Sequence, residues 1–167
     1  MNLYFLRHGI AVERSIADSE NDAWRSLTGK GERRVRRIAQ AMKALNLSFD
    51  IILSSPYRRA KQTAEIVAEV LRKSDKLKFL ESLTPQGDSK CVIEHINRSS
   101  PAPASVLLVG HEPSLSELIA RLVSDGTELS LTMKKGGLCK LSTTKLKHGR
   151  CATLEWLLTP KQMELMS

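Results

Sequence analysis

The chain has 167 residues, of which 41% are hydrophobic and 26% charged, an ordinary balance for a globular protein. This length suits one domain, residues 1–167, and is short for two. The net charge of +8 favours anionic partners, but aromatic residues make up only 4% and do not interleave with the basic ones, so nucleic acid is not the expected partner. We expect phosphate groups or acidic protein surfaces instead.

Two further classes of protein are not expected from the sequence. No apolar stretch approaches membrane-spanning length, and no basic segment precedes the short apolar run at the start, so we expect no membrane partner and no signal peptide. The three cysteines, Cys91, Cys139 and Cys151, are odd in number and lack metal-ligand spacing. These features predict a protein of the reducing cytoplasm with packed thiols, although Cys139 and Cys151 could face each other on neighbouring strands.

The first predicted element is a buried strand over residues 3–6, which Arg7, His8 and Gly9 end. Gly9 allows a sharp turn there and leaves Arg7 and His8 at the carboxyl end of the strand, the end at which open α/β sheets bind ligands. The polar residues 13–26, which include Arg25, have no sustained period and predict a loop.

Helices and strands then alternate. Thr28 is a candidate N-cap for a helix with a buried stripe at Val35, Ile38 and Met42. The basic residues 33–37 are expected on the solvated face of this helix, and the alternative is that they bind an acidic partner or nucleic acid. Further strands are predicted at 50–53, 76–80, 105–109, 137–142 and 151–158, and further helices at 57–71, around 92–96 and from Pro113 to 123. The pattern predicts an α/β fold, a three-layer sandwich with a mainly parallel central sheet and helices on both faces.

Three of these strands end in polar residues that carry chemistry. They are followed by Arg7-His8-Gly9, by Ser54-Ser55-Pro56 with Arg58 and Arg59 beyond, and by Gly110-His111. If the strands are parallel, all three ends meet at one edge and form a cationic group with no acidic residue at its centre. Arginine pairs with phosphate oxygens, and a neutral histidine can attack phosphorus. A second histidine, if protonated, can donate to the oxygens on which charge builds.

Together these stretches resemble the histidine phosphatase superfamily, which includes phosphoglycerate mutases and many acid phosphatases. Arg7-His8-Gly9 matches its naming motif, residues 55–64 match its second signature, and residues 109–113 resemble its third. The resemblance implies a phosphoglycerate mutase-like fold, with His8 as a nucleophile that forms a phosphohistidine intermediate. It also implies that Arg7 and Arg59, rather than Arg58, clamp the phosphoryl group and that His111 completes the pocket.

Within the superfamily the chain is most similar to the phosphohistidine phosphatases, in residues 22–28 and 81–88 as well as in the signatures. The likeness implies that Arg25 and Gly9 are further substrate-binding residues, with Arg25 as a ligand of the phosphate. For the general acid that monoesterases require, it leaves Glu81 as the first candidate and Asp22 as the second. No cofactor or metal is expected, because the cationic and neutral donors already supply what a magnesium ion would give the phosphoryl oxygens.

The leading hypothesis is a phosphatase that removes phosphate from phosphohistidine on a signalling or phosphotransfer protein and releases phosphate ion. The first alternative is a small-molecule phosphomonoesterase that uses the same site with Glu81 as acid. The second is a catalytically silent module that binds phosphorylated proteins. The intact set of Arg7, His8, Arg59 and His111 argues against silence.

Overall fold

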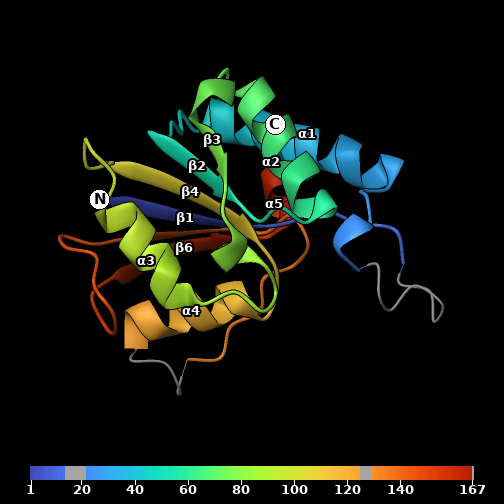
Figure 1. The fold of residues 1–167 in the computed structure, drawn as a ribbon. Coiled ribbons are helices and arrows are strands. Elements are labelled where there is room, and N and C mark those ends of the chain that lie inside the picture. Colours follow the sequence, from blue (N-terminus) through green and yellow to red (C-terminus); the bar gives the residue numbers. More distant parts are fainter. Residues whose placement is uncertain (14–21, 125–128, 167) are drawn as a thin grey trace.

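A six-stranded sheet forms the centre of the computed structural model, which describes residues 1–13, 22–124 and 129–166 (Figure 1). The strand order is β3-β2-β4-β1-β5-β6. β1, β2, β3 and β4 pair in parallel, whereas β5 is antiparallel to both of its neighbours. The bounds are β1 (Asn2–Arg7), β2 (Ile51–Ser54), β3 (Leu77–Phe79), β4 (Ser105–Gly110), β5 (Leu138–Ser142) and β6 (Thr153–Leu158).

Helices cover both faces of this sheet, which confirms the predicted α/β sandwich (Figure 1). One hydrophobic cluster joins the sheet to α1 (Gly29–Ala44), α2 (Arg58–Val70) and α5 (Pro160–Glu164). The other joins the opposite face to α3 (Ser89–Asn97) and α4 (Ser114–Ser124). Since both faces are covered, β1, β2 and β4 are almost entirely apolar and buried, as parallel strands of this kind usually are.

The parallel strands carry their polar ends to one edge, as expected. β1 and β4 are paired up to Arg7 opposite Gly110, and β2 and β4 up to Ser54 opposite Val109. The residues that follow these three strands therefore all leave the sheet at the edge formed by the carboxyl ends of the strands. This geometry places the two histidine motifs and the start of α2 around a common point.

Close packing of the chain after β1 fixes the direction in which His8 points. A Cβ atom on Gly9 would lie 2.6 Å from Cγ2 of Val35, and one on Gly31 would lie 2.0 Å from the carbonyl oxygen of Ile10. Both positions need glycine because the loop and α1 touch there. The Thr28 hydroxyl accepts the Gly31 amide at 3.0 Å, which confirms Thr28 as the N-cap of α1.

Some sequence predictions need correction at this level. Cys139 lies opposite Leu157 in the β5–β6 pair, and Cys151 precedes β6, so the two do not face each other across the strands. Pro113 immediately precedes α4 and does not lie in its first turn. Of the predicted loop over 13–26, residues 14–21 lie outside the described residues, and 22–24 form a short 3-10 turn. None of the helices in the described residues combines the length and apolarity needed to span a bilayer.

Candidate active site

His8 is buried at the end of β1 with one ring nitrogen directed at an arginine. Its Nδ1 lies 2.7 Å from the carbonyl oxygen of Gly9, and its Nε2 lies 3.3 Å from Nε of Arg59. A carbonyl oxygen only accepts and a guanidinium only donates, so Nδ1 carries the hydrogen and Nε2 carries the lone pair. Burial is the main cause that lowers the pKa of His8 to about 3, and the charges of neighbouring cations add to it. His8 is therefore a neutral base with its nucleophilic nitrogen fixed in place.

Arg59 brings the guanidinium group to this nitrogen. It lies in the first turn of α2 and is 3% exposed, whereas the adjacent Arg58 is exposed. The two arginines differ in burial because successive helical residues point about 100° apart. Of the two, Arg59 is the one that faces His8, and its role as the phosphoryl clamp stays a prediction. Nη1 donates to the main-chain oxygen of Asp22 at 2.6 Å, and Nη2 donates to its carboxylate at 2.8 Å.

Asp22 lies among these cations, so the prediction that the cationic group at the sheet edge has no acidic residue at its centre is wrong. Its carboxylate forms ion pairs with Arg59 at 2.8 Å and with Arg25 at 2.7 Å. Burial opposes the ionisation of Asp22, but hydrogen bonds and charges from the two arginines outweigh it and lower the pKa of the carboxyl group. Asp22 therefore occupies donors that Arg59 would offer to an oxyanion.

Arg7 is the second guanidinium at the sheet edge. Nη1 donates to the carbonyl oxygen of Met133 at 2.6 Å, and the buried Nε has no hydrogen-bond partner within the described residues. Burial lowers the pKa of Arg7, and the charge of Glu112 opposes this shift. A buried N–H without a partner is costly, so Arg7 keeps a donor for which an anion would compensate.

His111, after β4, is the second imidazole of the site. Its ring centroid lies 5.1 Å from that of His8, and Nε2 lies 2.9 Å from the hydroxyl of Ser55. Burial, followed by the nearby His8, lowers the pKa of His111 to about 2, so the ring is neutral in the free site. Nδ1 is buried without a partner in the described part of the chain. When the Ser55 hydroxyl donates to Nε2, Nδ1 carries the hydrogen and can donate to a phosphoryl oxygen.

The remaining predicted residues lie at different distances from this centre. Arg25 is held beside Arg59 through Asp22 and also donates to the carbonyl oxygen of Val12 at 3.1 Å. The Gly9 amide is already used, because it donates to the Thr63 hydroxyl at 3.1 Å. Gly9 thus contributes a close approach to α1, and its amide does not face the centre.

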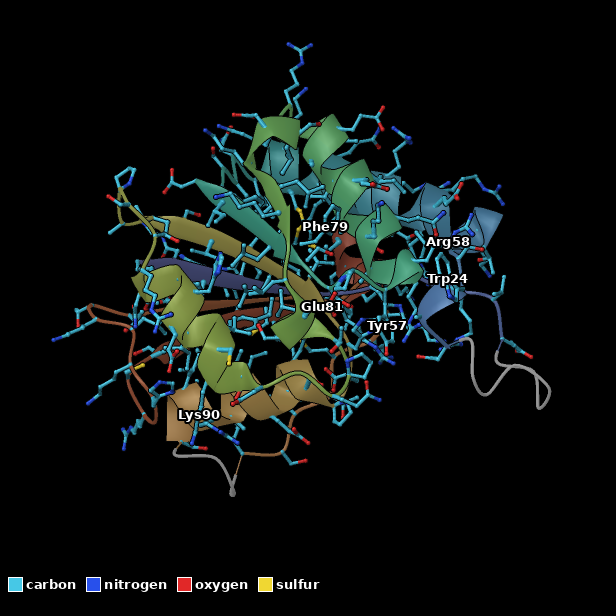
Figure 2. All side chains as sticks on the ribbon, viewed as in Figure 1. Trp24, Tyr57, Arg58, Phe79, Glu81 and Lys90 are labelled. Carbon is cyan, nitrogen blue, oxygen red and sulfur yellow. The ribbon has the colours of Figure 1, made fainter. Side chains whose placement is uncertain are left out.

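Glu81 lies apart from the histidines, on the rim of a groove. This groove has a volume of about 710 Å³ and includes Trp24, Tyr57 and Glu81 in its lining (Figure 2). The Tyr57 ring packs edge-on against His111 at 5.3 Å, so the groove borders the centre directly. Glu81 is exposed, whereas Asp22 contacts Arg59. Asp22, the second acid candidate from the sequence, is therefore the one that contacts an arginine of the centre.

Several residues of the site were not singled out from the sequence. Thr63 supports both Gly9 and the main chain of Arg59, Ser55 holds His111, and the charge of Lys135 acts on His8. Ser55, Thr63 and Glu112 stand inside the recognised signatures, which was the available signal. Lys135 had none, because it reaches the site from the segment before β5.

The centre combines one neutral nucleophilic nitrogen and a second imidazole with two guanidinium groups, that of the buried Arg59 and that of the half-buried Arg7. Such a set can bind a tetrahedral oxyanion and attack its central atom. Among the described residues, no group of three or more His, Cys, Asp or Glu side chains could hold a metal ion.

Known proteins are similar to this chain in sequence and fold. Residues 3–84, which include Arg7, His8 and Arg59, match the family model of the histidine phosphatase superfamily (branch 1). An uncharacterised protein of Picosynechococcus sp. is 40% identical over 142 residues, 84% of each chain. The phosphohistidine phosphatase SixA of Escherichia coli K12 is 28% identical over 166 residues, 99% of this chain and 98% of SixA.

A solved structure shows the same likeness in three dimensions. The structure of the protein histidine phosphatase SixA complexed with tungstate has a TM-score of 0.81 and 28% identity, with 96% of this chain and 98% of that chain covered. The fold, the family match and the full-length relative agree, and they bear out the resemblance to the histidine phosphatase superfamily. The chain is a phosphatase that belongs to the histidine phosphatase superfamily and is similar to SixA.

Proposed function

We propose that the protein hydrolyses phosphohistidine on another protein through a covalent phosphohistidine on His8. The observation that carries this proposal is the state of the acid–base groups around Nε2. The nucleophile is neutral, and Asp22, the carboxyl group in contact with the arginines of the centre, has a lowered pKa. An ionised carboxylate is a poor general acid, so the site suits a leaving group that needs little help.

In the first step the Nε2 lone pair of His8 attacks phosphorus and the bond from phosphorus to the substrate imidazole breaks. The departing imidazole takes its proton from water and leaves as a neutral ring. Arg7 and Arg59 bind the equatorial oxygens, and Nδ1 of His111 donates to a third, so each group acts on charge that builds in the transition state. The phosphoryl group replaces the Asp22 carboxylate on Arg59, while Asp22 keeps its pair with Arg25.

In the second step water attacks the phosphorus of the His8 adduct, and the bond to Nε2 breaks. One proton of the attacking water passes to solvent, where it balances the hydroxide left when water protonated the departing imidazole. The electron pair returns to the imidazole of His8, and phosphate ion is released. A return of the Asp22 carboxylate to Arg59 then favours departure of the product. The cycle needs no redox partner and regenerates the resting hydrogen bonds.

The open groove supports a protein-bound substrate. The groove has a volume of about 710 Å³, and Tyr57 in its lining packs against His111. Trp24, which is 70% exposed, also lines it (Figure 2). Tryptophan is enriched at protein–protein interfaces, so an exposed Trp24 beside the reacting centre favours contact with a protein surface. The similarity to SixA supports the same substrate class, because that protein is a phosphohistidine phosphatase.

Leaving-group dependence tests the proposal. The rates on a phosphohistidine peptide and on an alkyl phosphate should be measured for wild type, Glu81→Gln and Asp22→Asn in one buffer. We expect the peptide to be the better substrate and Glu81→Gln to leave its rate nearly unchanged, because imidazole departs without a strong acid. A better rate on the alkyl phosphate that Glu81→Gln abolishes would establish the small-molecule phosphomonoesterase instead. No turnover of either compound would indicate a silent binding module.

A further inference from the structure

A second hollow, strongly cationic, borders the phosphoryl site on the Arg7 side. It has a volume of about 500 Å³, and the cations that line it are Arg7, Arg34, Lys134, Lys135 and Lys161. No acidic residue is among its lining in the described part of the chain. We call the space bounded by these five residues the basic hollow.

Strand register explains why the basic hollow lies next to His8. Leu138 of β5 pairs with Leu6 of β1 on one side and with Leu158 of β6 on the other. β6 therefore ends at the same sheet edge as β1, and the chain beyond it delivers Lys161 there. The Gly136 amide lies 3.0 Å from the carbonyl oxygen of Arg7 and 3.1 Å from that of His8, which holds the two preceding lysines over this edge.

Most of this positive charge is not neutralised by carboxylates of the described residues. Arg34 pairs with Glu164 at 3.1 Å. Lys134, Lys135 and Lys161 have no carboxylate within ion-pair distance in residues 1–13, 22–124 and 129–166. Like charges gathered without counter-charges repel one another, so an arriving anion would be stabilised there.

The groove on the other side of the centre has a different character. There Arg58 and Lys61 are accompanied by Glu65 and Glu81, so the lining is electrically balanced. The two flanks of the phosphoryl site thus differ in charge. A partner that covers both would place an acidic surface on the basic hollow and a mixed, partly apolar surface on the groove.

We propose that the basic hollow binds an acidic patch on the protein that carries the phosphohistidine; this rests on the proposed function. A folded carrier can bring its phosphorus to Nε2 of His8 only by resting on the rim of the site, where Lys134 and Lys161 are exposed. Carboxylates that reach these lysines lie within a Debye length of about 8 Å and are little screened at physiological salt. Complementary charge of this kind raises the association rate and selects among carriers.

The test uses two phosphohistidine peptides of equal length, one flanked on both sides by Glu and the other by Gln. The pocket variant is Lys134→Gln with Lys161→Gln, which leaves Arg7 and Lys135 in place because they act on the reacting centre. The matched control is Lys78→Gln with Lys90→Gln, the same loss of charge away from the site; Lys90 lies far from Tyr57 and Glu81 in Figure 2. Free phosphohistidine serves as the substrate that cannot reach the hollow, and thermal denaturation checks the fold of each variant.

Wild type and control should prefer the Glu peptide by about tenfold in kcat/KM, as a few surface charge pairs allow, and the pocket variant should lose this preference. Its kcat on free phosphohistidine should match wild type. Equal kcat/KM for the two peptides in wild type, or a preference that survives in the pocket variant, would overturn the inference alone. If wild type hydrolyses neither peptide, the proposed function fails and the inference with it.

Discussion

Replacing Arg59 with alanine examines how the buried guanidinium contributes to catalysis. In the free site Nη1 and Nη2 donate to the oxygens of Asp22 at 2.6 and 2.8 Å, and Nε donates to the nucleophilic nitrogen of His8. We expect two phosphoryl oxygens to take the places of the two Asp22 oxygens on Nη1 and Nη2. Two charge-assisted hydrogen bonds contribute about 1.5–3 kcal/mol each, so Arg59→Ala should lower kcat/KM by roughly 100- to 10,000-fold.

Steady-state kinetics on free phosphohistidine measure this effect without contributions from protein contacts. Arg58→Ala is the matched control, because Arg58 is exposed in the groove and should be dispensable for kcat. Arg59→Lys keeps the charge but not the planar fork, and its activity should fall between the two. A large loss in Arg58→Ala with a small one in Arg59→Ala would refute the assignment, since the helix would then present the other arginine to the phosphoryl group.

Three further predictions concern protons, the Asp22 carboxylate and metals. The folded-state pKa values of His8 and His111 are about 3 and about 2, below the value of 6.5 for free imidazole, so the unfolded chain binds protons first as the pH falls. The free energy of unfolding should therefore decline from pH 6.5 downwards by up to about 1.4 kcal/mol per histidine per pH unit. Urea titrations measure this slope, and His111→Asn should halve it. A free energy that does not change with pH would contradict the burial of neutral rings. Asp22→Asn should lower the inhibition constant of phosphate about threefold or more, because the anion no longer competes with a carboxylate for Arg59. An unchanged inhibition constant would show that Asp22 does not compete. Activity should survive a chelator, and loss that a divalent ion restores would require a different mechanism.

The sheet and the position of the site were largely predictable from the sequence, because both depend on local patterns. Apolar runs at 3–6 and 105–109 that stop at Arg7-His8 and Gly110-His111 indicated buried strands with functional ends. Parallel pairing of β1 with β4 then brings the ends together without further information. Arg59 was distinguished from its neighbour by the family resemblance, because it stands directly before the Ala-x-Gln-Thr segment of the second signature.

Contacts between segments distant in the sequence were not predictable in the same way. The pairing of Asp22 with Arg59 joins a turn of the early loop to a helix 37 residues later, and nothing in the loop's composition specifies it. The neutral state of His111 depends on burial by several elements at once. Lys135 reaches His8 only because β5 inserts antiparallel beside β1. Each of these features follows from tertiary packing rather than from a periodic pattern.

Trapping of the phosphoenzyme tests the central claim most directly. Wild type and His8→Ala should be mixed with a peptide whose phosphohistidine carries labelled phosphate, quenched in base within the first turnover, and examined for protein-bound label. We predict that wild type carries a label that is stable in base and lost in acid, as expected for a phosphoramidate, and that His8→Ala carries none. Equal labelling of His8→Ala, or hydrolysis by wild type without any labelled protein, would contradict the account.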